Sequence, residues 1–183
     1  ARTLLLLPGE YFFGRSVTLP EGIAESDIPS FAELSVEGFS PFPMEQLLWG
    51  FLHHASCDHI YIYATSQGRV KQGGFEGLDQ FQNVFPTFVA GFGRTYSRPT
   101  VSFMAAEATF SALFYNANDP VPAQVCSMAL PEPAAGLSEL KELRQEWLKK
   151  LPTKDFALDD SILRASAPII NRNSITIPVR EVG

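Results

Sequence analysis

Short apolar runs separated by proline and glycine predict several strands in the first half of the chain. The expected strands cover residues 3–7, 11–19, 45–54, 59–65 and 87–92. Apolar residues fill these runs or alternate along them, as expected for half-buried or buried strands. In the fourth run, Ile60 and Ile62 should face one side of a sheet, and Tyr61 and Tyr63 the other.

Helical spacing predicts two helices in the same half. The first begins at Ser26 or Asp27, both suitable N-caps, and ends near Gly38. Phe31, Leu34 and Gly38 lie on one of its faces. The second is expected to end at Pro86, which cannot continue a helix. Its apolar residues are Leu78, Phe81, Val84 and Phe85. Between the fourth strand and this helix, residues 68–74 are polar and are expected to form a loop.

The second half predicts a β-meander followed by an amphipathic helix. Three strand-like segments, residues 100–105, 109–115 and 121–130, are separated by short turns. A helix begins at Ser138 and ends before Pro152, and its apolar stripe is expected to face the core. The stripe consists of Leu140, Leu143, Trp147, Leu148 and Leu151. A last strand is expected at residues 174–182.

Together these elements predict an α/β fold, in which a mixed β-sheet is flanked by helices and an antiparallel β-meander is appended. The first lobe covers residues 1–98. The meander, the amphipathic helix and the closing strand occupy residues 99–183 and are expected to pack on that lobe as one domain. A chain of 183 residues with 45% hydrophobic residues can fill such a core.

Charge and cysteine content narrow the classes of partner. The net charge of −6 argues against nucleic acid and leaves a basic or neutral protein surface as the natural partner. Two cysteines, Cys57 and Cys126, do not make a disulfide framework, so a reducing compartment is expected. No apolar run reaches the roughly 20 residues of a membrane span. The chain begins without Met, and we expect any membrane anchor to lie outside it.

All three histidines lie within seven positions, next to a cysteine. If residues 55–58 form a hairpin loop, His54 and His59 become a cross-strand pair that Cys57 could join, while His53 faces the other way. This set offers at most three metal ligands, in a spacing that matches no common zinc pattern. A polar hairpin tip is therefore preferred, and we expect no metal. A metal-dependent or thiol hydrolase using His54, Cys57 and His59 is the alternative.

Other catalytic patterns are missing from the sequence. Gly91-Phe92-Gly93 lacks the third glycine of a dinucleotide-binding loop and is interpreted as a turn. No nucleophile elbow of the form Gly-x-Ser-x-Gly occurs. Asp159 and Asp160 are expected to cap a short helix over residues 161–164. We therefore expect no cofactor and no catalytic residue.

A series of short motifs resembles one family of assembly proteins. The motifs are Leu5-Leu6-Leu7-Pro8-Gly9-Glu10, Val17-Thr18-Leu19-Pro20, a helix carrying Glu33 and Glu37, Pro41-Phe42-Pro43, and Tyr61-Ile62-Tyr63-Ala64. Over about residues 3–92 the chain resembles the cytoplasmic, actin-like domain of the L subunit of type II secretion systems. It also resembles the related M protein of type IV pilus assembly. Phe42, between two prolines, is expected to fill the space between helix and sheet.

The resemblance implies an actin-like (RNase H-like) lobe and a non-catalytic scaffold at the cytoplasmic face of the inner membrane. Its implied partners are an assembly ATPase and inner-membrane platform subunits, and a homodimer is possible. Pilus M proteins open with an Asp-x-Gly phosphate loop, which residues 9–14 lack. A nucleotide-binding actin-like protein is therefore kept only as an alternative. The chain is also about half as long as a complete actin-like molecule.

Overall fold

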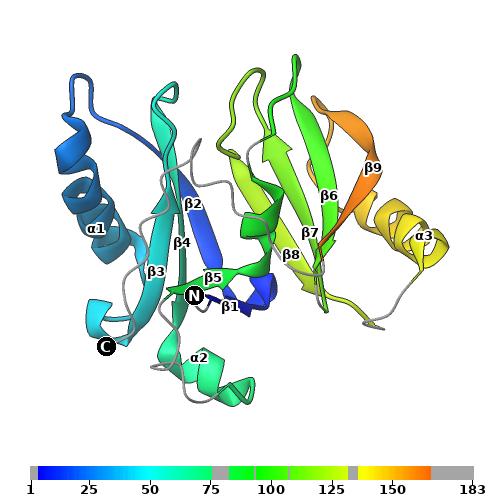
Figure 1. Cartoon of the computed structure of the whole chain (residues 1–183), viewed down its shortest axis with the longest axis horizontal. Coiled ribbons are helices and arrows are strands. Elements are labelled where there is room, and N and C mark those ends of the chain that lie inside the picture. The colour runs from blue at the N-terminus through cyan, green and yellow to red at the C-terminus, as the bar shows by residue number, and fades with distance from the viewer. Residues whose placement is uncertain (1–3, 76–82, 93, 107, 132–135, 166–183) are drawn as a thin grey trace.

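The computed structural model describes residues 4–75, 83–92, 94–106, 108–131 and 136–165. These residues form an α/β fold built in layers (Figure 1). One helix covers the outer face of a three-stranded sheet, and another covers the outer face of a four-stranded sheet. The two sheets pack against a shared apolar core that lies between them.

The three-stranded sheet is antiparallel and has β4 at its centre. Its order is β2 (Phe13–Thr18), β4 (His59–Ser66) and β3 (Leu47–Leu52). Every residue of β4 is buried, because both faces of the strand are covered. Ile60 and Ile62 belong to the core on the helix side, whereas Tyr61 and Tyr63 belong to the core between the sheets. The alternation predicted for this strand is therefore confirmed.

Helix α1 (Ile28–Phe39) lies on the outer face of this sheet. It buries one stripe, formed by Ile28, Ala32 and Val36, at the helical spacing of four residues. Burial of a large apolar side chain such as Ile28 contributes about 1.5–3 kcal/mol. The predicted helix is confirmed, although it is preceded by a short 3-10 turn, η2 (Glu25–Asp27). The face with Phe31, Leu34 and Gly38 is not the buried one, because Leu34 is 68% exposed.

The four-stranded sheet contains the predicted meander. Strands β6 (Thr100–Ala106), β7 (Thr109–Tyr115) and β8 (Gln124–Ala129) pair antiparallel in sequence order. Helix α3 (Leu137–Leu148) covers the outer face with the predicted stripe, of which Leu140 is fully buried. Trp147 packs against Phe103 and Phe110, with ring centroids 5.9 and 5.6 Å away. The core-facing interpretation of the stripe is confirmed.

The core between the sheets is organised around Phe88. This residue lies in η5 (Thr87–Gly91), a 3-10 turn that follows the short strand β5 (Asn83–Pro86). Its ring makes edge-to-face contacts with the rings of Phe12, Tyr61, Tyr63 and Phe92, at centroid distances of 6.1–6.4 Å. Tyr115 of β7 donates a hydrogen bond to the carbonyl of Gly91 at 3.1 Å. The η5 turn thereby joins both sheets.

Three predictions around this turn are wrong. Residues 83–86 are not the end of a helix, because β5 pairs in parallel with β1 (Leu4–Leu7). Residues 87–91 form the 3-10 turn η5 and not a strand. The successive residues Phe88 and Val89 belong to the same core, whereas neighbours in a strand point to opposite faces. Residues 67–72 form helix α2 (Gln67–Gln72), not a loop. The Ser66 hydroxyl caps α2 by accepting from the Arg69 N–H, and Val70 is buried against Leu7 and Leu48.

Other predictions are wrong in the second half and at the proline corner. Residues 157–165 form β9 (Ala157–Ala165), parallel to β6, where a helix cap and a short helix were expected. Helix α3 has its N-cap at Gly136 and not at Ser138, and the Glu139 carboxylate accepts from the Gly136 N–H. Phe42 does not fill a core position, because its side chain is 41% exposed. The Ser40 hydroxyl instead holds the Phe42 backbone in a tight turn.

Two small elements complete the described chain, η1 (Gly9–Tyr11) before β2 and η3 (Met44–Gln46) before β3. The expected strand at residues 174–182 and most of the expected second helix lie outside the described residues. The described strands form three sheets, and among these the four-stranded sheet is the mixed one. Within the described ranges, no helix is long and apolar enough to span a bilayer.

Gly14 of β2 provides a test of the packing between the sheets. A Cβ at this position would overlap the hydroxyl and ring edge of Tyr61, which is held in the central core. We expect Gly14→Ala to lower the free energy of unfolding by about 1–3 kcal/mol, the usual cost of overpacking. Urea denaturation measures this change.

The matched control is Gly38→Ala on α1, where an added Cβ meets no atom within 4 Å. Alanine is the better helix former, so this substitution should raise the free energy of unfolding by about 0.5–1 kcal/mol. Equal effects of the two substitutions would contradict the assigned packing of Tyr61.

Candidate functional site

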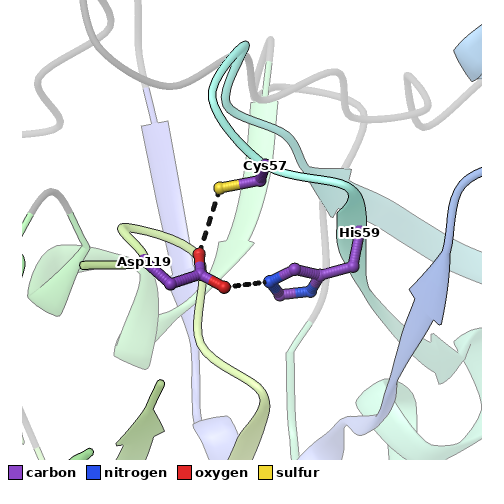
Figure 2. Close-up of side chains that lie close together, drawn as sticks. All are labelled: Cys57, His59 and Asp119. Atoms are coloured by element: carbon purple, nitrogen blue, oxygen red, sulfur yellow. Dashed lines mark hydrogen bonds and ion pairs between the residues drawn. The ribbon is translucent and has the colours of Figure 1, made fainter. Parts of the chain in front are cut away.

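Three chemically different side chains converge where the two sheets meet (Figure 2). Cys57 lies in the turn between β3 and β4, and His59 is the first residue of β4. Asp119 comes from the loop between β7 and β8, about 60 residues away in sequence. Cys57 Sγ donates to Asp119 Oδ1 at 3.0 Å, and His59 Nε2 lies 2.5 Å from Asp119 Oδ2. The carboxylate thus bridges the thiol and the imidazole.

Neighbouring groups fix the orientation of two of these side chains. The second ring nitrogen of His59, Nδ1, is hydrogen bonded to the Ser16 hydroxyl on β2 at 2.9 Å. The Asp119 carboxylate accepts a hydrogen bond from the backbone N–H of Val121 at 2.9 Å. The His59 and Asp119 side chains are only 9% and 16% exposed. The cluster of Cys57, His59 and Asp119 is therefore largely shielded from water and held by hydrogen bonds from β2 and from the β7–β8 loop.

This arrangement does not activate Cys57 as a nucleophile. Burial, together with the hydrogen bond to Asp119, raises the pKa of the Cys57 thiol to about 12. The thiol donates to a carboxylate and not to an imidazole, so the nucleophile–base contact of a thiol enzyme is missing among these residues. In the metal-free protein Cys57 is a protonated thiol at neutral pH.

The three candidate ligands from the sequence are brought together only in part. Cys57 and His59 meet, but His54 is outside their group. Its Nδ1 is bonded to Ser56 within the turn, at 2.6 Å from the hydroxyl. The third member of the group is Asp119. The sequence marks its loop only as a turn, and no local pattern links that turn to a hairpin 60 residues earlier.

His53 is buried beside this turn and lines a cavity of about 330 Å³. Glu21, Glu25, Ile28 and Cys57 line the same cavity. Burial lowers the pKa of the His53 imidazole, an effect that nearby Glu25 opposes. His53 is therefore a group that the folded protein prefers to keep neutral.

The remaining sequence candidates have structural roles in the described residues. Gly91 is buried in η5, where an added Cβ would crowd the Met104 sulfur. Asp159 accepts a hydrogen bond from the Tyr96 hydroxyl at 2.8 Å and lies 3.7 Å from Arg94. Burial alone would raise the pKa of Asp159, but hydrogen bonds from Ser161 and Tyr96 and the charge of Arg94 lower it. Asp159 thus acts as a structural acceptor between β9 and the segment before β6.

The net negative charge of the chain is concentrated in one segment, residues 20–46. Residues 20–46, which contain α1 and its flanking turns, hold six of the 20 acidic residues and none of the 14 basic ones. The other 14 acidic and 14 basic residues balance, so this segment accounts for the whole net charge of −6. All six acidic side chains are exposed; they are Glu21, Glu25, Asp27, Glu33, Glu37 and Glu45.

Exposed apolar side chains lie in the same segment. Leu34 on α1 is 68% exposed, and Phe42 in the turn after α1 is 41% exposed. Leu34 belongs with Glu33 and Glu37 to the exposed face of α1, opposite the stripe that packs on the sheet. We call residues 20–46 the acidic layer. Acidic groups around a few exposed apolar ones are a suitable surface for a basic protein partner.

Comparisons with known proteins give structural similarities only. No protein-family model matches the chain, and a search of curated proteins also finds no match. The cytoplasmic domain of EpsL, an inner membrane component of the type II secretion system of Vibrio cholerae, is similar with a TM-score of 0.47 and 12% identity. That match covers 90% of this chain and 62% of the EpsL chain.

Two further solved structures are similar. One is the PilM-PilN type IV pilus biogenesis complex, with a TM-score of 0.48, 11% identity and coverage of 79% of this chain and 46% of the other. The other is a Bacteroides thetaiotaomicron protein with an actin-like ATPase fold and unknown function, with a TM-score of 0.40 and 8% identity. That match covers 94% of this chain and 62% of the Bacteroides protein chain.

The first two structures come from the secretion and pilus systems that the sequence motifs resemble. This chain spans less than two thirds of each of these proteins. Because every TM-score is below 0.5, the similarities by themselves decide neither the fold nor the function of this chain.

The buried His53 generates a prediction about pH. Its pKa is lower in the folded than in the unfolded state, so below about pH 6.5 the unfolded state binds more protons. We expect this group to reduce the free energy of unfolding as the pH falls from about 6.5 towards the folded-state pKa. Urea denaturation at pH 7.5, 6.5 and 5.5, in buffer containing a chelator, measures the loss.

The variant His53→Gln should lose less stability over this pH range than the wild type. The matched control is His54→Gln, since that ring lies in the exposed part of the same turn. An acid-induced loss that is identical in the wild type and in His53→Gln would show that His53 is not its source.

Proposed function

We propose that this protein is a non-catalytic docking scaffold of a secretion or type IV pilus assembly platform, on the cytoplasmic side of the inner membrane. Its acidic layer binds a basic surface of an assembly ATPase or of another platform subunit. The distribution of charge carries this proposal, because the whole net charge of −6 lies in residues 20–46.

The positions in the fold of the sequence motifs that resemble the secretion and pilus family support the proposal. Residues 5–10 and 17–20 include most of β1 and η1 and the end of β2, and residues 61–64 are the centre of β4. The motifs at residues 17–20 and 61–64 contribute to the three-stranded sheet on which α1 lies, whereas residues 5–7 pair with β5 in a separate sheet. Glu33 and Glu37, also part of the resemblance, project from the exposed face of α1. The motifs of β2 and β4 therefore support α1, and Glu33 and Glu37 form part of its acidic surface.

Physical chemistry favours a protein partner for the acidic layer. At physiological ionic strength the Debye length is about 8 Å, so the acidic groups of one layer act together on a charged partner that approaches closely. Such complementarity mainly raises the association rate and selects against acidic partners. Leu34 supplies apolar area that can be buried on contact. Residues 20–46 contain no basic side chain that would pair internally with the six carboxylates.

The experiment measures binding of the purified chain to purified platform proteins from the same source, by pull-down and surface plasmon resonance. We expect Glu33→Lys/Glu37→Lys to weaken binding about tenfold or more, mainly through a slower association rate. Binding of the wild type should weaken as salt is raised, and that dependence should be smaller in the variant. Leu34→Ala should instead increase the dissociation rate.

The matched control is Glu142→Lys/Glu146→Lys, a double charge reversal on exposed residues of α3. It changes the net charge equally but lies outside the acidic layer, so binding should be nearly unchanged. Equal weakening by both double variants would show a nonspecific charge effect. No binding to any platform protein would overturn the assignment to this machinery.

A thermal-shift measurement distinguishes the scaffold from the nucleotide-binding alternative. A ligand that binds only the folded state raises the melting temperature with its concentration. We expect ATP with Mg²⁺ to leave the melting temperature unchanged. A rise that grows with ATP concentration would favour a nucleotide-binding protein over a scaffold without nucleotide chemistry.

A further inference from the structure

Cys57, His59 and Asp119 form a donor set that suits a transition metal. They offer one thiol sulfur, one imidazole nitrogen and one carboxylate oxygen, and these ligand atoms all lie within 4.8 Å of one another. Zinc is bound in proteins by these three ligand types, at about 2.0–2.3 Å. Tetrahedral geometry with such bonds places the ligand atoms roughly 3.3–3.6 Å apart. Small side-chain movements would therefore convert the observed contacts into a coordination shell.

Outer hydrogen bonds hold the ligands as metal sites in proteins usually do. A metal-binding histidine commonly uses its second ring nitrogen in a hydrogen bond that fixes the ring. His59 does this through Nδ1 and Ser16, which leaves Nε2 directed at the cluster. The N–H of Val121 fixes the Asp119 carboxylate in the same way.

We propose that Cys57, His59 and Asp119 bind one divalent ion of the zinc class, which ties the β3–β4 turn to the β7–β8 loop. The proposal does not depend on the docking function. Cys57 and His59 belong to the three-stranded sheet and its turn, and Asp119 to the four-stranded sheet, so one ion cross-links the two halves of the fold.

The binding step is an exchange of a proton for a metal. The ion replaces the Cys57 thiol proton, which is released to solvent. The proton on His59 Nε2, which faces Asp119, leaves, and the neutral ring carries its proton on Nδ1, where it donates to the Ser16 hydroxyl. Nε2 then gives its lone pair to the ion. One oxygen of Asp119 provides the third bond, and a water molecule completes four-coordination. No oxidation or reduction takes place. Because the ion binds a site made only by the folded chain, it stabilises the folded state.

The test uses the purified chain after treatment with a chelator. Calorimetric titration with Zn²⁺ should give one ion per chain, and Zn²⁺ should raise the melting temperature with its concentration. Co²⁺ should produce a sulfur-to-metal charge-transfer absorption, because Cys57 is a ligand. Cys57→Ser should abolish that absorption, and Asp119→Asn should weaken Zn²⁺ binding by at least tenfold.

Positioning and control variants separate this site from other metal binding. Ser16→Ala removes the hydrogen bond that holds the His59 ring, and it should weaken Zn²⁺ binding about 10–100-fold. Cys126→Ser and His54→Ala should leave both the affinity and the Co²⁺ spectrum unchanged, since neither residue belongs to the cluster. Circular dichroism checks that each variant is folded.

Three results would overturn the proposal. One is a lack of Zn²⁺ binding by the folded wild type, which would make the cluster a hydrogen-bonded contact only. The second is a Co²⁺ spectrum without a sulfur band, or a sulfur band that Cys126→Ser removes. The third is a Zn²⁺-induced stabilisation that persists in Cys57→Ser and Asp119→Asn.

Discussion

The packing of Phe88 between two sheets is the interaction on which the rest of the fold depends. Each sheet has an outer face covered by its own helix and an inner face that must be removed from water. Phe88 meets aromatic rings of the three-stranded sheet directly, while Tyr115 of the other sheet bonds to the same 3-10 turn. Aromatic side chains suit this place because they bury a large area with few rotatable bonds. The position of the η5 turn is thereby fixed from both sides.

That packing also creates the cluster of Cys57, His59 and Asp119. His59 starts the central strand β4, whose tyrosines contact Phe88. Asp119 lies in the loop after β7, the strand that carries Tyr115. When the sheets close on the shared core, these two strands bring their ends together, and the carboxylate meets the imidazole and the thiol. The cluster is therefore a consequence of the sheet packing and also a link that reinforces it.

The acidic layer, in contrast to the cluster, has exposed acidic side chains on and around α1. Helix α1 uses one stripe for the sheet and leaves its other face without a partner in the described chain. Like charges on that face repel one another and add nothing to folding, which fits a surface kept for an external contact. The cluster links the β3–β4 turn and the start of β4 to the β7–β8 loop. Helix α1 lies on the outer side of the three-stranded sheet (Figure 1). The proposed metal site and the proposed docking surface therefore lie in different parts of the molecule.

The sequence by itself determined the elements whose burial follows a local period: β4 with its isoleucines and tyrosines, the meander, and the apolar stripe of α3. It located α1 but not the buried face of that helix, since Leu34 of the expected face is exposed. Such periods report which face of an element is covered, whatever covers it. Tertiary structure alone decided β5, η5 and β9, since β5 is a strand only because it pairs with β1, and β9 because it pairs with β6. It also decided the candidate site. The clustered histidines made Cys57 and His59 candidates in the sequence. In the structure, His54 is hydrogen bonded to Ser56, and the third member of the cluster is Asp119, from a loop with no distinguishing sequence pattern. The physical reason is the same in both cases, because partners far apart in the chain leave no trace in the local period of either segment.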